Sequence, residues 1–161
     1  MNKSWIANGF TAANALFGGL SIMMSISGEY HVAAICILIA MAADAFDGRV
    51  ARALGTAGPM GVELDSLSDD ISFGVAAGAL MYSYQLRELG AFGFIPCALL
   101  GAFCAFRLAR FNVKVTSVHG YFEGLPCPTV GVIIACYVLS GVKIWNWLAM
   151  VCVLALAVLM V

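Results

Sequence analysis

The stretch at residues 44–70 reads DAFDGRVARALGTAGPMGVELDSLSDD and carries five aspartates, one glutamate and two arginines. Strongly apolar segments of the chain lie on both sides of it. Ionisable groups at membrane depth are costly, and where they occur they usually serve binding or catalysis. The position of this charge therefore predicts two apolar helices that meet at a polar site.

The composition excludes an ordinary soluble domain. Of the 161 residues, 63% are hydrophobic and only 11% are charged, and the mean hydropathy is +0.98. Soluble domains are about 45–50% apolar and about 25% charged. The net charge of −1 and the absence of a basic run give no support to nucleic-acid binding. We expect an all-α integral membrane protein.

Six apolar stretches are candidates for membrane-spanning helices, each of which needs about 20 residues. They cover residues 5–27, 32–54, 61–84, 91–111, 129–139 and 144–161. The connections are short except for residues 112–128, so neighbouring helices should run antiparallel. The predicted fold is a bundle of six transmembrane helices that forms one catalytic domain over residues 1–161.

The lysines and arginines predict the orientation of this bundle, because cytoplasmic loops carry an excess of them. One side would carry Lys3, Arg49, Arg52, Arg107, Arg110 and Lys114, and the other side only Arg87 and Lys143. Both termini and the charged stretch should therefore face the cytoplasm, with the protein in the cell membrane. The N-terminal apolar stretch lacks a cleavage pattern and is expected to stay as the first span.

The cysteines and histidines give no sign of a site of their own. No two of the six cysteines form a CxxC pair, so we expect small hydrophobic side chains rather than disulfides or a zinc site. His31 and His119 are expected in loops. Ser66 and Ser68 lie beside the acids without a histidine partner, so a serine nucleophile is not indicated.

Two pairs of aspartates within the charged stretch have helical spacing. Asp44 and Asp47 are three residues apart, and Asp65 and Asp69 are four apart, so each pair shares one helix face. The short turn between the two helices lets the pairs face each other. Four converging carboxylates would repel one another unless cations lie among them. Oxygen ligands favour Mg²⁺, with Mn²⁺ or Ca²⁺ as substitutes, and two such ions suit phosphoryl-type transfer.

Small residues and an arginine accompany these acids. Gly48 and Ala51 leave room beside the expected metals, and Gly61 does the same on the next helix. Arg52 could pair with a phosphate through two hydrogen bonds. The glycines could instead serve helix packing.

Together these residues form the pattern D-x2-D-G-x2-A-R-x8-G-x3-D-x3-D without a gap. The pattern resembles the signature of the CDP-alcohol phosphotransferase family, which has a core of six transmembrane helices. Family members exchange the CMP of a CDP-linked lipid or alcohol for the hydroxyl of a second alcohol. The resemblance implies that Asp44, Asp47 and Asp65 are metal ligands and that Asp69 is both a ligand and the general base. It also implies contacts to the CDP moiety from Gly48, Ala51 and Arg52, with space provided at Gly61.

An element near the N-terminus adds to the resemblance. Asn8, Thr11 and Asn14 match an Asn-x2-Thr-x2-Asn element that lies near the nucleotide in the family. The chain departs from the family at two positions. Ala7 stands where many relatives have Pro, and Gly58 stands where many have Ser or Thr. A backbone contact at Gly58 would replace a contact from a side-chain hydroxyl to the nucleotide.

Three runs resemble the branch of the family that uses L-serine as the acceptor: LDSLSDDISFG at 64–74, RLARFNV at 107–113 and FEGLPCP at 122–128. This implies CDP-diacylglycerol and L-serine as substrates and CMP as a product. Arg107 or Arg110 could bind the serine carboxylate, and Glu123 or an acid near the metals could bind its ammonium group. The backbone of Gly124 and Leu125 could shape the pocket. The two arginines and Lys114 could instead anchor the cytoplasmic face or bind the phosphates of the CDP-lipid.

Two other readings differ in function. The acceptor could be glycerol phosphate, inositol phosphate or another alcohol, which residues 107–128 should decide. A small cation channel or transporter would spread its acids along a pathway through the bilayer, whereas here they gather at one end. The family resemblance implies a homodimer. Close helix contact would be permitted by the small residues Gly74, Gly78, Gly93 and Gly101.

Overall fold

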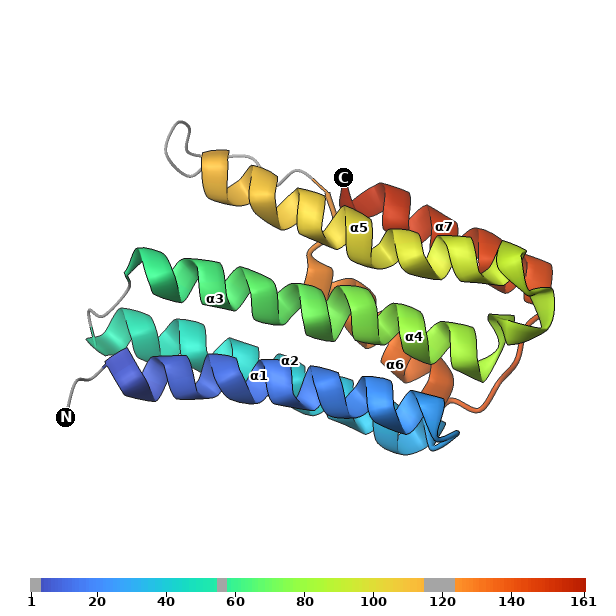
Figure 1. The fold of residues 1–161 in the computed structure, drawn as a ribbon, viewed down its shortest axis with the longest axis horizontal. Helices are drawn as coiled ribbons and strands as arrows, with labels where there is room; N and C mark the ends of the chain where they lie inside the picture. The colour runs from blue at the N-terminus through green and yellow to red at the C-terminus, as the bar shows by residue number, and fades with distance from the viewer. Residues whose placement is uncertain (1–3, 55–57, 115–123) are drawn as a thin grey trace.

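All regular structure in the described ranges is helical (Figure 1). The computed structural model describes residues 4–54, 58–114 and 124–161, with side chains described at 9–46, 58, 60–113 and 124–161. The elements in chain order are α1 (Ser4–Ile26), α2 (Tyr30–Leu54), α3 (Pro59–Asp69), η1 (Asp70–Val75), α4 (Ala76–Tyr84), η2 (Leu86–Leu89), α5 (Ala91–Lys114), α6 (Cys127–Leu139) and α7 (Asn146–Met160). The α class predicted from the sequence is therefore confirmed.

The helix expected at residues 61–84 is a single rod with a π-helical turn inside it. α3, the π-helix η1 and α4 follow one another directly, and the backbone angles at both junctions are helical. A π turn places one more residue in each hydrogen-bonded ring than an α turn, and such turns are frequent at functional sites. Here the π turn begins at Asp70, directly after the last aspartate of the signature.

The elements pack around this rod. α1 packs along α2 as an antiparallel pair, and the turn between them contains Gly28, whose φ of 84° favours glycine. η1 contacts α1, α5 and α6, so the π turn lies between elements that are distant in the sequence. Figure 1 shows the start of α1, the end of α2 and the start of α3 at one end of the bundle.

The small residues on η1, α4 and α5 serve packing within this chain. A Cβ atom at Gly78 would collide with the carbonyl oxygen of Cys97, and one at Gly74 would lie 3.0 Å from the Cβ of Cys104. A Cβ at Gly93 would meet the carbonyl of Leu86 in the same way. The glycines allow α5 to approach the rod closely, so the close helix contact that they permit is an internal one.

The outer faces of several helices are apolar, which indicates association with a membrane. Large exposed side chains on these faces include Met23 at 65%, Phe94 at 57% and Val151 at 54% exposure. Two stretches, Gly9–Ile26 and Ala91–Val113, are long and apolar enough to cross a bilayer. The apolar helices Cys127–Leu139 and Asn146–Met160 are shorter than the length of about 20 residues that a span needs. The predicted count of six spans is therefore not confirmed by helix length.

Candidate functional site

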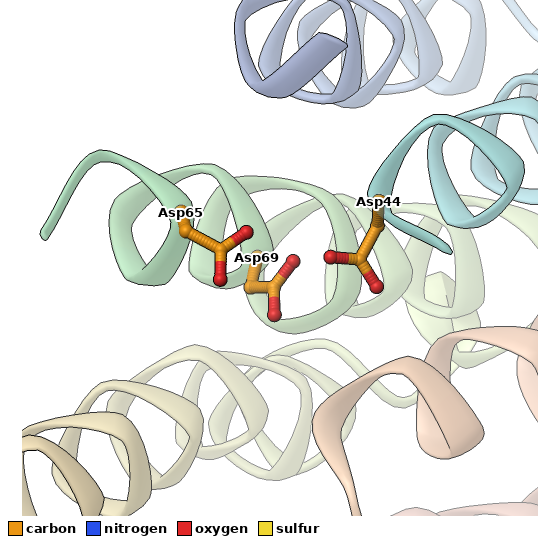
Figure 2. Close-up of side chains that lie close together, drawn as sticks. All are labelled: Asp44, Asp65 and Asp69. Carbon is orange, nitrogen blue, oxygen red and sulfur yellow. The ribbon is translucent and has the colours of Figure 1, made fainter. Parts of the chain in front are cut away.

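Three aspartates from two helices converge at one end of the bundle. Asp44 lies on α2, and Asp65 and Asp69 lie one turn apart on α3. Each offers a carboxylate oxygen, and these atoms all lie within 4.8 Å of one another. Figure 2 shows the three carboxylates pointing toward a common space. Asp69 is buried, with 8% of its surface exposed, while Asp44 and Asp65 are partly buried.

This cluster fits a divalent cation. The three side chains supply only hard oxygen donors, which suit Mg²⁺, Mn²⁺ or Ca²⁺ better than softer metals. Three like charges at this spacing and depth are strongly unfavourable without a cation among them. The sequence predicted this convergence from the four-residue spacing of Asp65 and Asp69 and from the turn between the helices.

The fourth predicted ligand, Asp47, has a side chain outside the described set. Its backbone lies in α2, three residues after Asp44, and this spacing places both residues on one face of the helix. The neighbouring signature residues Gly48, Ala51 and Arg52 also lie in α2, and their side chains are likewise not described. Their predicted contacts to the nucleotide stay predictions.

A buried network holds Asp69 in place. The amide nitrogen Nδ2 of Asn14 donates to Oδ1 of Asp69 at 3.0 Å. The hydroxyl of Ser72 donates to the carbonyl oxygen of Asn14 at 2.9 Å. Asn14 and Ser72 are fully buried, so α1 and the π turn together fix the orientation of this carboxylate. The amide Oδ1 of Asn14 is buried and has no hydrogen-bond partner among the described residues.

The sequence had placed Asn14 near the nucleotide but had not linked it to Asp69. Thr11, one turn earlier on α1, is buried at 5% exposure, and the side chain of Asn8 lies outside the described set. Ser72 belongs to the quoted run at 64–74, which marked the segment as informative without giving this residue a role. No feature of the sequence predicted the π turn.

The glycines at the start of α3 lie close to the acids in the chain. Gly58 is the N-cap residue of α3, with extended backbone angles and no side-chain cap. Its carbonyl oxygen accepts a hydrogen bond from the backbone N–H of Gly61 at 3.0 Å. The first turn of α3 therefore forms without the side-chain hydroxyl that many family members have at this position.

The basic end of α5 lies beside the same site. Asn112 donates through Nδ2 to the hydroxyl of Ser66 at 3.0 Å, which ties α5 to the helix turn between Asp65 and Asp69. Arg107 donates through Nη1 to the sulfur of Cys127, at the start of α6, at 3.7 Å. Arg110 instead donates to the carbonyl oxygen of Val161 at 3.2 Å. The two arginines that were predicted to bind serine therefore have different partners.

Two predicted serine contacts precede α6. Gly124 has a φ of 83°, and a Cβ atom there would lie 2.7 Å from the carbonyl oxygen of Met160. The nitrogen of Leu125 also donates to the carbonyl of Leu159 at 2.9 Å. The backbone at Gly124 is thus fastened to the end of α7. Glu123 and His119 lie outside the described residues.

Comparison with known proteins identifies the family of this chain. A family model described as CDP-alcohol phosphatidyltransferase matches residues 4–159. A CDP-diacylglycerol–serine O-phosphatidyltransferase of Helicobacter pylori is 38% identical over 137 residues, which cover 84% of this chain and 58% of the relative. An archaetidylserine synthase of Methanothermobacter thermautotrophicus is 40% identical over 130 residues, covering 80% of this chain and 55% of the relative.

A CDP-diacylglycerol–serine O-phosphatidyltransferase of Bacillus subtilis is 38% identical over 122 residues, which cover 75% of this chain and 68% of the relative. The chain thus spans little more than half the length of the first two of these proteins. The family model nevertheless covers nearly the whole chain. The protein belongs to the CDP-alcohol phosphatidyltransferase family.

Proposed function

We propose that this member of the family is a phosphatidylserine synthase, which transfers the phosphatidyl group of CDP-diacylglycerol to the hydroxyl of L-serine and releases CMP. One observation carries the proposal. The three relatives described above are named for serine or for archaetidylserine, and they align with 75–84% of this chain. The three clustered aspartates are consistent with this chemistry because they can hold a metal beside a pyrophosphate.

The proposed setting is the cell membrane, with six spans and the acid cluster facing the cytoplasm. The distribution of lysine and arginine supports this orientation, and the apolar outer side chains support a lipid environment. CDP-diacylglycerol would keep its tails in the bilayer and present its CDP group to the cluster. A homodimer is proposed from family resemblance alone.

The proposed metal site consists of Asp44, Asp47, Asp65 and Asp69, which together could hold two Mg²⁺ or Mn²⁺ ions, with Ca²⁺ as a substitute. Bound ions would neutralise charge on the pyrophosphate and on the leaving phosphate. Residues proposed to contact the CDP-lipid are Asn8, Thr11, Asn14, Gly48, Ala51, Arg52, Gly58 and Gly61. Arg52 would pair with the pyrophosphate, and the small residues would leave space for it.

Asp69 is proposed as the general base. The serine oxygen would form a bond to the phosphorus on the lipid side of the pyrophosphate as its proton passes to Asp69. The bond from that phosphorus to the bridging oxygen would break, and CMP would leave with the bond's electron pair. Asn14 supports this role because its amide fixes one oxygen of the carboxylate, so the other oxygen would accept the proton. A positioned base contributes about 10²–10⁴-fold to a rate.

The serine carboxylate is proposed to bind at Arg107, which is partly buried and lies on α5, a helix that packs against η1 directly after Asp69. Arg110 is a weaker candidate because its guanidinium already donates to the end of α7. Glu123 would accept from the serine ammonium group, and the fixed backbone at Gly124 would shape the pocket.

The experiment is CMP release by purified protein in detergent with Mg²⁺ or Mn²⁺. The donor is CDP-diacylglycerol or its ether-lipid analogue, since one relative is named for archaetidylserine. The acceptors compared are L-serine, glycerol 3-phosphate and inositol phosphate. Serine-dependent release is expected. Release with a different acceptor would keep the family and overturn the proposed acceptor, and no release with any acceptor would contradict the transferase activity.

A further inference from the structure

A small polar cluster lies where α5 meets the start of α6, beside the acids. Nη1 of Arg107 donates to the sulfur of Cys127 at 3.7 Å. Cys104 lies one turn before Arg107 on α5. Both cysteines are fully buried at 0% exposure. Cys127 therefore fixes one side of the Arg107 guanidinium from a second helix.

A second donor of the same guanidinium has no partner among the described residues. Nε of Arg107 is buried and has no hydrogen-bond acceptor within the part of the chain that the structure describes. A buried donor without an acceptor is unfavourable. Nε and Nη2 form one edge of the guanidinium, and this edge matches the two oxygens of a carboxylate. Since Nη1 donates to Cys127, the Nε edge is the one that can receive a carboxylate.

This edge lies close to the reacting groups. Both α5 and α6, which begins at Cys127, pack against η1, whose first residue directly follows Asp69. An acceptor held by its carboxylate at Arg107 would therefore have its hydroxyl close to the proposed base. The negative charges of Asp69 and Asp70 also disfavour binding of the acceptor's carboxylate unless that carboxylate pairs with a fixed cation. The orientation of Arg107 should thus determine which acceptors can bind.

We propose that Cys127 is a positioning residue for acceptor selection: it holds the Arg107 guanidinium so that the Nε edge receives the carboxylate of an amino-acid acceptor. This inference rests on the proposed function. It predicts preference for L-serine over ethanolamine, which has the same hydroxyl and ammonium groups but no carboxylate. The sequence had treated Cys127 only as a small hydrophobic side chain.

The test compares steady-state CMP release by Cys127→Ala, Cys127→Ser and Cys97→Ala with that of the unmodified protein. Cys97 is a matched control, because it is a buried thiol on α5 at 5% exposure that lies two turns from Cys104. We expect Cys127→Ala to raise the KM for L-serine about tenfold, the loss expected when a charge-assisted hydrogen bond is weakened. The KM for CDP-diacylglycerol and the kcat should stay close to those of the unmodified protein.

Cys127→Ser should restore most of the affinity for serine, because its hydroxyl can accept from Nη1. Preference for serine over ethanolamine should fall in Cys127→Ala and in Arg107→Lys, and stay unchanged in Cys97→Ala. If Cys127→Ala does not fold, Cys127→Val takes its place, since it retains volume without an acceptor.

Two outcomes separate this inference from the proposed function. Serine-dependent CMP release by the unmodified protein, with the same KM for serine in Cys127→Ala and Cys97→Ala, would overturn the role of Cys127 alone. No serine-dependent release by the unmodified protein would overturn the proposed function, and the inference with it.

Discussion

The two ends of the helix bundle differ in whether their buried polar groups have hydrogen-bond partners. At the end without the acid cluster, Gln85 is buried and makes several hydrogen bonds. It accepts from the hydroxyl of Tyr137 and donates to the carbonyl of Ile144 and to the side chain of Asn146. At the acid end, three carboxylates converge, and Asn14 and Arg107 keep buried polar atoms without partners among the described residues.

The difference distinguishes polar groups that stabilise the fold from polar groups that serve function within one apolar protein. A buried polar group without a partner costs free energy, and a satisfied one costs much less. The Gln85 network satisfies its own groups and links α4, α6 and the start of α7. The acid end contains clustered carboxylates and buried polar atoms without partners among the described residues, an arrangement that bound ions and substrates would stabilise. The predictions below test this contrast, from the largest expected effect to the smallest.

Removal of divalent ions should have the largest effect. Treatment with EDTA is expected to abolish CMP release, and added Mg²⁺ or Mn²⁺ should restore it. Because an ion that binds only the folded protein stabilises it by about 2.7 kcal/mol at one hundred times its Kd, Mg²⁺ should also raise the melting temperature. Asp65→Asn should lose this thermal shift, while Gln85→Leu should keep it. A shift of equal size in both variants would contradict the acid cluster as the metal site.

Asp69→Asn should lower kcat about 10²–10⁴-fold, the contribution of a positioned base. Binding of CMP, measured by calorimetry, should fall less than turnover because the other acids remain. Asp70→Asn is the neighbouring control, since Asp70 lies outside the three-carboxylate cluster, and its kcat should fall less than tenfold. Parallel loss of binding and turnover in Asp69→Asn would count against the base assignment.

A pair of adjacent glycines on α1 tests whether the Asn14 and Ser72 network supports activity. A Cβ atom at Gly18 would lie 2.9 Å from the Cα of Ser72, whereas one at Gly19 would meet nothing within 4 Å. Gly18→Ala should push the π turn away from α1 and reduce kcat about tenfold or more, since small displacements of catalytic groups are damaging.

Gly19→Ala should leave activity unchanged and stabilise α1 slightly, because alanine favours a helix by about 0.8–1.0 kcal/mol over glycine. Activity and melting temperature of both variants provide the readout. Similar kcat values for the two would show that the position of Ser72 has no influence on the site.

Gln85→Leu should give the smallest effect on activity. The substitution removes several hydrogen bonds and leaves their buried partner groups unsatisfied, so the protein should be destabilised by about 1–3 kcal/mol. The kcat/KM of the folded fraction should not change, because no residue of the acid end contacts Gln85 in the hydrogen bonds that the structure gives it. Thermal unfolding in detergent and activity at low temperature separate the two quantities. A large loss of kcat/KM would show that the two ends are coupled.

Much of the site could be predicted because it depends on helical spacing. The interval between Asp65 and Asp69 fixes both carboxylates on one face of α3, and because few residues separate α2 from α3 in the sequence, Asp44 comes to lie close to them. The apolar composition also predicted an all-helical chain. The number of membrane-spanning helices was harder to predict, because α6 and α7 are shorter than a full span.

The sequence alone thus determined the helical class, the family pattern and the convergence of the acids, since each depends on local periodicity. Only the tertiary structure decided the partners that come from distant helices. These include the bond from Asn14 to Asp69, the π turn that brings Ser72 to α1, and the thiol of Cys127 against Arg107. The physical reason is that such contacts depend on the distance and the rotation between packed helices. These depend on the volumes of all the side chains at the interface and not on the local sequence alone.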